Sequence, residues 1–167
     1  MSDIQAKPKF APPPKGRRQP GWKVWCTRQA LRALGWRIRG NMPIQFWRTT
    51  LVVYAPQPWQ LNALRMAMPI QTARLIIDSD SSERWAHAIS EHIDHRQATA
   101  VHLDSNLSQL EDIVTAARAA KTRITLCAWD AQRKFVHIHA PFKTSPFPDR
   151  DLHYIRRYFG YFSQQAD

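Results

Sequence analysis

Two amide side chains stand where a strand-like run of the sequence gives way to a helix-like one. The apolar run of residues 49–55 ends at Pro56, Gln57 follows it, and Asn62 comes five residues after Gln57. Loops that follow the strands of an α/β sheet commonly hold ligands and catalytic groups. An amide has no usable pKa, so neither side chain can act as a general base or as its charged partner. The sequence therefore predicts a corner placed for catalysis but without titratable groups.

Histidines are the next residues that could carry chemistry. His87, Glu91 and His95 recur every four residues, which puts them on one face of a predicted helix and could present ligands to a metal. The spacing is not the His-Glu-x-x-His pattern, so we expect a solvated helix face, with no metal and no cofactor. His137 and His139 project to the same side of a predicted strand, as an exposed sheet face would also require. No serine lies at a recognisable nucleophile turn.

The elements that would position these residues alternate between strand and helix patterns. Strand patterns cover residues 36–40, 49–55, 72–77, 99–103, 124–129 and 135–140, and helix patterns cover residues 22–34, 59–68, 81–95, 107–120 and 149–163. The run 49–55 is continuous and β-branched, which is typical of a strand covered on both faces. We predict an α/β fold: a mostly parallel sheet flanked by helices, with a C-terminal hairpin and helix.

Composition divides the chain of 167 residues into a basic arm and a domain. Residues 1–20 hold five prolines among lysines and arginines, which predicts a disordered arm, and residues 21–167 form the predicted domain. Residues 1–50 contain eleven Lys or Arg against one Asp, net +10, whereas residues 51–167 contain thirteen against twelve, net +1. No run is apolar enough for a membrane span or a signal peptide, so we expect a cytoplasmic protein.

Tryptophan and cationic residues interleave in the basic front of the chain. This pattern suits the head-group layer of an anionic membrane, where the ring lies at the interface and the cation meets lipid phosphate. It also suits single-stranded nucleic acid, although no nucleic-acid-binding signature accompanies it. Tryptophan is also a frequent core residue. The residues predicted to bind lipid or another anion are Arg17, Arg18, Trp22, Lys23, Trp25, Arg28 and Arg32.

Several stretches resemble the glycerolipid (lysophosphatidic acid) acyltransferase-like family, particularly its small bacterial members. Residues 34–40 read Leu-Gly-Trp-Arg-Ile-Arg-Gly, similar to the family's Leu-Gly-Trp-Arg-x-x-Gly. Residues 52–57 and Asn62 are similar to its Val-Val-Ala-Pro-His strand end with the H-x-x-x-x-D motif. Residues 126–134 and 151–159 resemble its C-terminal strand, loop and helix. The resemblance implies an acyltransferase-like α/β fold.

In that family the motif His is the general base on the acceptor hydroxyl, and the Asp orients it before attack on an acyl thioester. The resemblance puts Gln57 and Asn62 at these two positions. The family's Glu-Gly-Thr-Arg block, which holds the acceptor phosphate, falls at residues 103–106, which contain neither Gly nor Arg. We therefore expect a non-catalytic relative that binds anionic membrane lipid or a lipid-synthesis protein, peripherally at the inner face of the membrane.

Two other functions stay open at this point. An active acyltransferase, which transfers an acyl chain from a thioester to a lysophospholipid hydroxyl, would need another base, and His87, His102 or His137 would have to reach the substrate. A basic nucleic-acid-binding module would use the same positive charge through its attraction to phosphates. Competition between lipid and nucleic acid for the protein would separate the lipid-binding function from the second alternative.

Overall fold

The computed structural model describes residues 15–40, 47–77, 81–103, 107 and 109–163. Within them, the strands are β1 (Arg37–Gly40), β2 (Thr49–Tyr54), β3 (Thr72–Leu75), β4 (Ala98–Leu103), β5 (Arg123–Asp130), β6 (Phe135–Ile138) and β7 (Phe142–Lys143). The helices are α1 (Gly21–Ala33), α2 (Pro58–Ala67), α3 (Ser82–Asp94), α4 (Leu110–Ala119) and α5 (Pro148–Ser163). The predicted alternation of strands and helices is confirmed.

All seven strands belong to one sheet, in the order β1-β6-β5-β2-β4-β3, with β7 beside the start of β5. Strands β5, β2, β4 and β3 are parallel neighbours, whereas β6 returns antiparallel to β5 as the predicted hairpin. Strand β1 then pairs in parallel with β6. The predicted α/β fold with a mostly parallel sheet is therefore confirmed. The two-residue β7 was not predicted, because two residues show no alternation.

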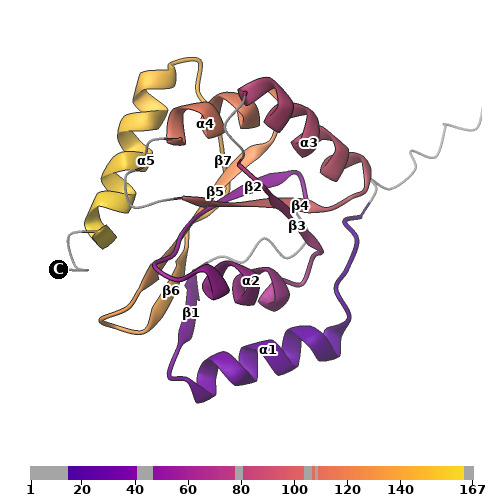
Figure 1. Cartoon of the computed structure of the whole chain (residues 1–167), viewed down its shortest axis with the longest axis vertical. Coiled ribbons are helices and arrows are strands. Elements are labelled where there is room, and N and C mark those ends of the chain that lie inside the picture. Colours follow the sequence, from indigo (N-terminus) through magenta and orange to yellow (C-terminus); the bar gives the residue numbers. More distant parts are fainter. Residues whose placement is uncertain (1–14, 41–46, 78–80, 104–106, 108, 164–167) are drawn as a thin grey trace, which may run out of the picture.

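Alternate side chains of the central strands enter two separate cores. Leu51 and Val53 of β2 pack with residues of α1 and α2, whereas Val52 and Tyr54 pack with residues of α3, α4 and α5. Figure 1 shows the resulting three layers, with α1 and α2 below the sheet and the other three helices above it. Every residue of β2 is buried, as expected for a parallel strand covered on both faces.

The segment of residues 15–20 is attached to the domain, which corrects the predicted boundary. The Arg17 N–H donates to the Arg96 carbonyl at 2.8 Å, and the Gln19 N–H donates to the Pro69 carbonyl at 3.0 Å. In return, the Gln71 N–H donates to the Arg17 carbonyl at 2.8 Å. These are backbone bonds, which composition does not reveal, so the domain begins before Gly21. Residues 1–14 of the predicted arm lie outside the described residues.

Two glycines fix the path from α1 into β1. Gly35, which follows the C-cap residue Leu34, has φ +83°, a left-handed conformation that glycine adopts without steric cost. Gly40 ends β1 with φ +107°, and a Cβ there would lie 1.9 Å from the Ile138 carbonyl oxygen. The two glycines therefore allow β1 to lie close beside β6.

Candidate functional site

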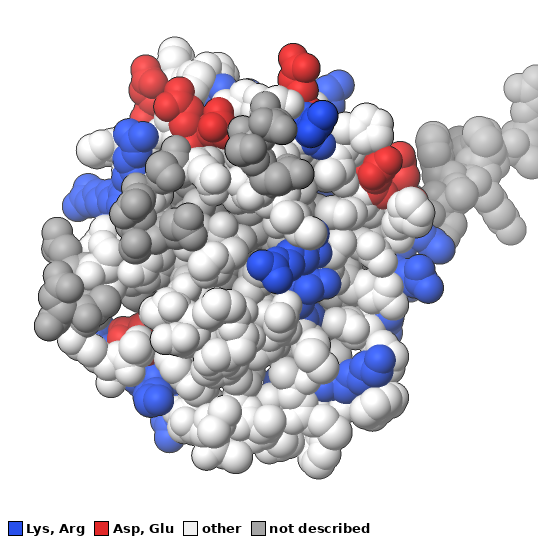
Figure 2. All heavy atoms as spheres, viewed as in Figure 1, with Lys and Arg blue, Asp and Glu red and all other residues white. Residues whose placement is uncertain are grey.

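Charge is divided between the layers of the fold. Residues 4–77 contain thirteen Lys or Arg and no Asp or Glu, whereas residues 78–167 contain eleven Lys or Arg against twelve Asp or Glu. The first segment supplies α1 and α2, and the second supplies α3, α4 and α5. In Figure 2 most of the acidic side chains lie over the upper layer, while basic and uncharged side chains cover α1 and α2. The carboxylate-free segment extends well past residue 50, where the sequence analysis ended the basic part.

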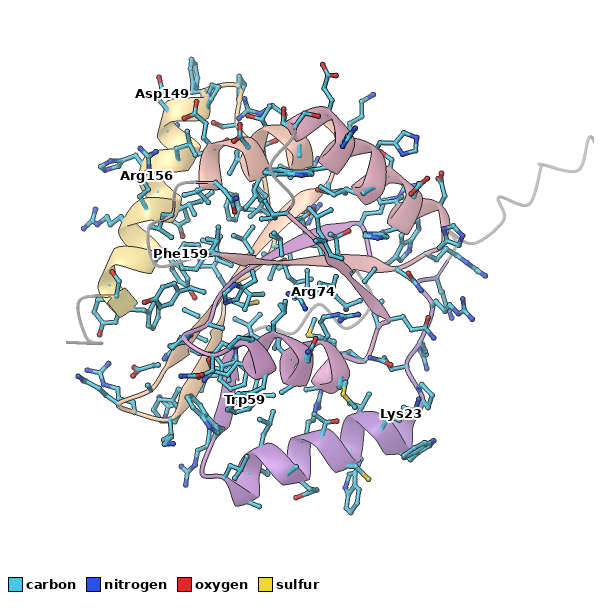
Figure 3. The ribbon with its side chains drawn as sticks, viewed as in Figure 1. Lys23, Trp59, Arg74, Asp149, Arg156 and Phe159 are labelled. Atoms are coloured by element: carbon cyan, nitrogen blue, oxygen red, sulfur yellow. The ribbon has the colours of Figure 1, made fainter. Side chains whose placement is uncertain are left out.

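Helix α1 leaves two of the predicted tryptophans in solvent. Trp22 is 67% exposed and Trp25 is 63% exposed, although Trp36, after the helix, is buried. The helix contains no acidic residue, and the Lys23 Nζ lies 5.6 Å from the centre of the Trp22 ring. Figure 3 shows Lys23 on this outermost helix. Trp36 is therefore a core residue, whereas the two tryptophans of α1 are not.

The predicted basic residues of this region differ in what they do. Arg28 is partly buried, and its Nε donates to the Ala67 carbonyl of α2 at 3.1 Å, so it fastens α1 to the domain. Arg32 is exposed in the last turn of α1, where a cation is favourable. Arg17 and Arg18 are exposed on the segment just before the helix. The exposed cations and the two exposed rings therefore lie on α1 and on the segment that leads into it, with Arg32 at the opposite end of the helix from Arg17 and Arg18.

The corner between β2 and α2 is built as a helix cap. Gln57 is the N-cap residue and Pro58 the first residue of the helix, where the missing N–H of proline is tolerated. The Gln57 N–H donates to Gln60 Oε1 at 2.9 Å, and the Gln60 N–H donates to the Gln57 carbonyl at 3.1 Å. Gln60 is buried and Gln57 is exposed. The first amide of the predicted corner therefore begins α2.

Asn62 faces an arginine of its own helix. Its Oδ1 accepts a hydrogen bond from Arg65 Nη1 at 3.3 Å, and the residue is exposed. Among the described residues, no hydrogen bond joins Asn62 to Gln57. The two amides that the resemblance places at the family's catalytic positions therefore do not form a hydrogen-bonded pair.

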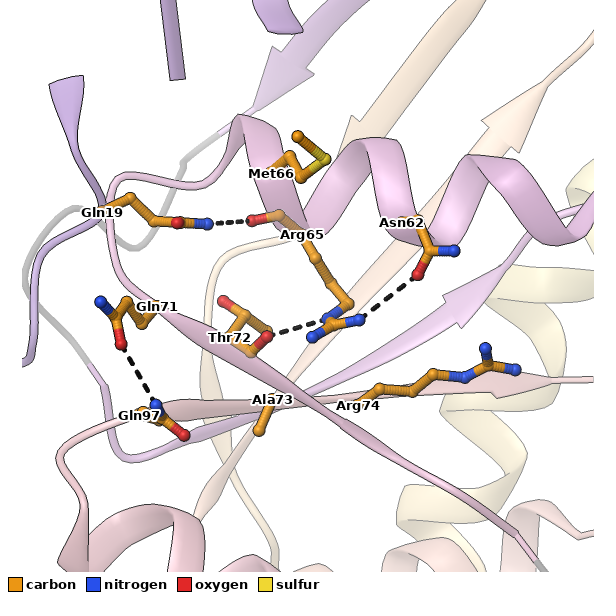
Figure 4. A pocket seen from close by; sticks show the side chains of 9 residues that line it. All are labelled: Gln19, Asn62, Arg65, Met66, Gln71, Thr72, Ala73, Arg74 and Gln97. Atoms are coloured by element: carbon orange, nitrogen blue, oxygen red, sulfur yellow. Dashed lines mark hydrogen bonds between the residues drawn. The ribbon is translucent and has the colours of Figure 1, made fainter. Parts of the chain in front are cut away.

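A pocket lies along the seam between α2 and β3, at the edge of the sheet (Figure 4). Its volume is about 710 Å³, and its lining consists of Gln19, Asn62, Arg65, Met66, Gln71, Thr72, Ala73, Arg74 and Gln97. Two of these residues are arginines, four carry amides, and none is acidic. Of the nine, the sequence analysis had singled out only Asn62. The missed signal is the absence of any carboxylate from residue 4 to residue 77.

Arg65 is held in place within this pocket. Its Nε donates to the Thr72 carbonyl at 2.8 Å, in addition to the bond from Nη1 to Asn62. Burial lowers the pKa of its guanidinium from the ordinary value, and the positive charge of Arg74 lowers this pKa further. Two neighbouring cations without a carboxylate between them repel each other, and a bound anion would relieve that repulsion.

No family model, curated protein or solved structure matches this chain. The resemblance to glycerolipid acyltransferases therefore stays a prediction. What the chain does must be argued from its own residues, and the two features that stand out are the exposed tryptophans of α1 and the arginine-lined pocket.

The side chains of His87 and Glu91 on α3, and of His95 at its C-cap, do not meet at one point where a metal could bind. His87 Nδ1 lies 3.5 Å from Glu91 Oε1, with both side chains exposed, whereas His95 Nδ1 donates to the Glu91 carbonyl at 2.8 Å. Across the described part of the chain, no three His, Cys, Asp or Glu residues are close enough together to hold a metal ion.

The three histidines considered as replacement bases lie on separate elements. His87 is on α3, His102 on β4 and His137 on β6. His102 lies nearest the corner, but its Nε2 donates to the Ala55 carbonyl at 2.8 Å, because a carbonyl can only accept. His137 packs against the Phe162 ring, with centroids 5.1 Å apart, and burial lowers its pKa. The structure gives these histidines no common site.

Proposed function

We propose that this protein binds the anionic surface of a membrane through α1, as a non-catalytic relative of the glycerolipid acyltransferases. One observation carries the proposal: Trp22 and Trp25 are mostly exposed on a helix that has no carboxylate. Indole rings lie favourably at the boundary between head groups and acyl chains, where one side is apolar and the other wet. Cations beside them meet lipid phosphates.

The way α1 is mounted on the domain supports this function. Its inner side packs on α2 through Leu31 and through the hydrogen bond from Arg28, so the outward direction of the two rings is fixed. Lys23 and Arg32 flank the rings with exposed positive charge. A cation near an anionic bilayer contributes about 1 kcal/mol to binding. Within the described residues, no helix has the length and apolarity of a membrane span.

Lipid is favoured over nucleic acid by the shape of the surface. Helix α1 is the outermost element of its layer (Figure 1), so it can lie flat on a bilayer. Single-stranded nucleic acid is usually bound along a positively charged groove with stacked bases. A protruding helix offers no such groove.

Flotation with vesicles tests the proposal. We expect the full chain to float with vesicles of phosphatidylglycerol and phosphatidylcholine, and not with phosphatidylcholine alone. A chain that begins at Lys15 keeps the backbone bonds of residues 15–20 and isolates the contribution of residues 1–14. Absence of flotation with the anionic vesicles would refute the proposal. Complete displacement of the protein from vesicles by a stoichiometric single-stranded oligonucleotide would favour nucleic acid instead.

The non-catalytic part has its own test, the double substitution Gln57→His with Asn62→Asp. We expect no acyl transfer from an acyl thioester to a lysophospholipid, because a carboxylate at position 62 would pair with the Arg65 guanidinium, which already contacts that side chain. The measurement is release of free thiol, followed with a thiol-reactive dye, in the double variant and in the wild type. A lysophospholipid-dependent rate in either protein would contradict the expectation.

A further inference from the structure

The pocket between α2 and β3 has an unused set of cationic donors at one end. A guanidinium carries five N–H groups. Arg65 uses two of them, one to the Thr72 carbonyl and one to Asn62 Oδ1. The Arg74 guanidinium makes no hydrogen bond or ion pair with any described residue. Figure 4 shows both arginine side chains reaching toward the end of the pocket where Asn62 lies.

At the other end of the pocket, the glutamine side chains already make hydrogen bonds within the protein. Gln97 Nε2 donates to Gln71 Oε1 at 3.2 Å, and Gln19 Nε2 donates to the Arg65 carbonyl at 2.9 Å. These hydrogen bonds hold the glutamine side chains in place, while the cationic donors that lack a partner among the described residues belong to Arg65 and Arg74, beside the Asn62 amide. A ligand should therefore be oriented with its negative group toward this second end.

No carboxylate lines the pocket to compete for these donors. Every lining residue except Gln97 comes from the stretch of residues 4–77, which lacks Asp and Glu. Arginine pairs are well suited to phosphate, because the planar guanidinium donates two parallel hydrogen bonds to its oxygens. Figure 3 places Arg74 at the middle of the face it shows, away from α1.

We propose that this pocket binds the phosphate group of a small organic molecule, held by Arg65, Arg74 and the Asn62 amide. The volume of about 710 Å³ is far larger than phosphate alone needs and lies in the range of small-molecule sites. The remaining amides and the side chains of Met66 and Ala73 would face the rest of the ligand. The pocket does not include the tryptophans of α1. The proposal of a phosphate site can therefore be tested independently of the proposal of membrane binding.

Titration with inorganic phosphate, at ionic strength held constant with chloride, tests the site. The readout is the shift of the arginine Nε–Hε signals in NMR spectra of the ¹⁵N-labelled protein. We expect saturable shifts in the wild type and about tenfold weaker binding in Arg74→Gln, since a lost charged hydrogen bond is typically of that size. The matched control is Arg156→Gln, which removes an exposed arginine of α5 and should leave the affinity unchanged.

A second variant separates loss of the site from loss of folding. Asn62→Asp should also abolish the phosphate shifts, because its carboxylate repels phosphate and pairs with Arg65, while the exposed position leaves the fold intact. Absence of saturable shifts in the wild type would overturn the proposal. Equal phosphate affinity in Arg74→Gln and Arg156→Gln would overturn it as well, since the ion would then be held elsewhere.

Vesicles identify the source of the phosphate group. If phosphatidylcholine vesicles that contain phosphatidic acid displace inorganic phosphate from the wild type, and phosphatidylcholine alone does not, the pocket takes a lipid head group. If inorganic phosphate binds with the same affinity in the presence of both kinds of vesicle, the pocket takes a soluble phosphomonoester. Both results support a phosphate site, and Arg74→Gln should weaken either interaction.

Discussion

Replacing Trp22 and Trp25 together by alanine should lower binding to anionic vesicles by more than tenfold. At about 25 cal/mol per Å², withdrawing on the order of 100 Å² of one ring from water contributes about 2.5 kcal/mol to the binding free energy for each ring. Even if half of that is realised, the two rings together exceed the 1.4 kcal/mol or so that corresponds to a tenfold change. The measurement is the partition coefficient from sedimentation with vesicles of phosphatidylglycerol and phosphatidylcholine.

The matched control is Phe147→Ala, which removes an exposed aromatic ring from the opposite side of the sheet. Phe147 is 65% exposed, close to the values for Trp22 and Trp25, and it precedes α5. It should leave partitioning within about twofold of the wild type, well under 1.4 kcal/mol. Equal losses in Phe147→Ala and in the double variant would mean that the vesicles contact no particular face, which contradicts a role for α1.

Charge should act differently from the rings. Lys23→Gln with Arg32→Gln should weaken partitioning at low salt and lose its effect at high salt, because screening removes the contribution of exposed charges. The burial of indole rings is not screened in this way. The two kinds of variant can therefore be told apart by the same assay repeated at two salt concentrations.

The fold was largely predictable because its local patterns agree with its tertiary contacts. The continuous apolar run of β2 predicted burial on both faces, and all of its residues are buried. The hairpin of β5 and β6 followed from two strand patterns and a short polar link. The pairing of β1 with β6 was not predictable, because it joins residues about a hundred positions apart through backbone bonds.

The attachment of residues 15–20 escaped the sequence analysis for the same reason. Proline and cationic residues predicted disorder, but the segment is held by backbone groups of Pro69, Gln71 and Arg96. Composition measures how much apolar surface a segment can bury, and it says little about a segment that is fixed by its main chain.

The pocket between α2 and β3 was not predicted from the sequence. The family resemblance directed attention to Gln57 and Asn62, and Asn62 does line the pocket. Arg74 gave no signal, since an isolated arginine on a short strand looks like any exposed residue. Its importance comes from Arg65 on the neighbouring helix and from the lack of carboxylates around both. That relation exists only when α2 is packed beside β3.

The largest loss of stability that we expect from a polar substitution is at Asp151, in the first turn of α5. This carboxylate is buried, and its Oδ2 accepts hydrogen bonds from Arg118 Nη2 at 3.1 Å and from the Ser145 N–H at 2.7 Å. Arg118 is partly buried, and its Nε has no hydrogen-bond partner among the described residues. Asp151→Ala would leave both donors without an acceptor, so the free energy of unfolding should fall by about 3 kcal/mol.

Urea unfolding followed by tryptophan fluorescence measures this change, with Asp149→Ala as the control. Asp149 is exposed in the same turn, so its removal should cost less than about 1 kcal/mol, the size of a helix-dipole contribution. Equal losses in the two variants would contradict a structural role for the bonds of Asp151. Asp151 lies in the α3–α5 layer, away from the cationic side of the sheet. Asp151→Ala protein that is still folded at low temperature should therefore bind anionic vesicles and phosphate as the wild type does. The reason is that neither proposed site contains residues of α3, α4 or α5.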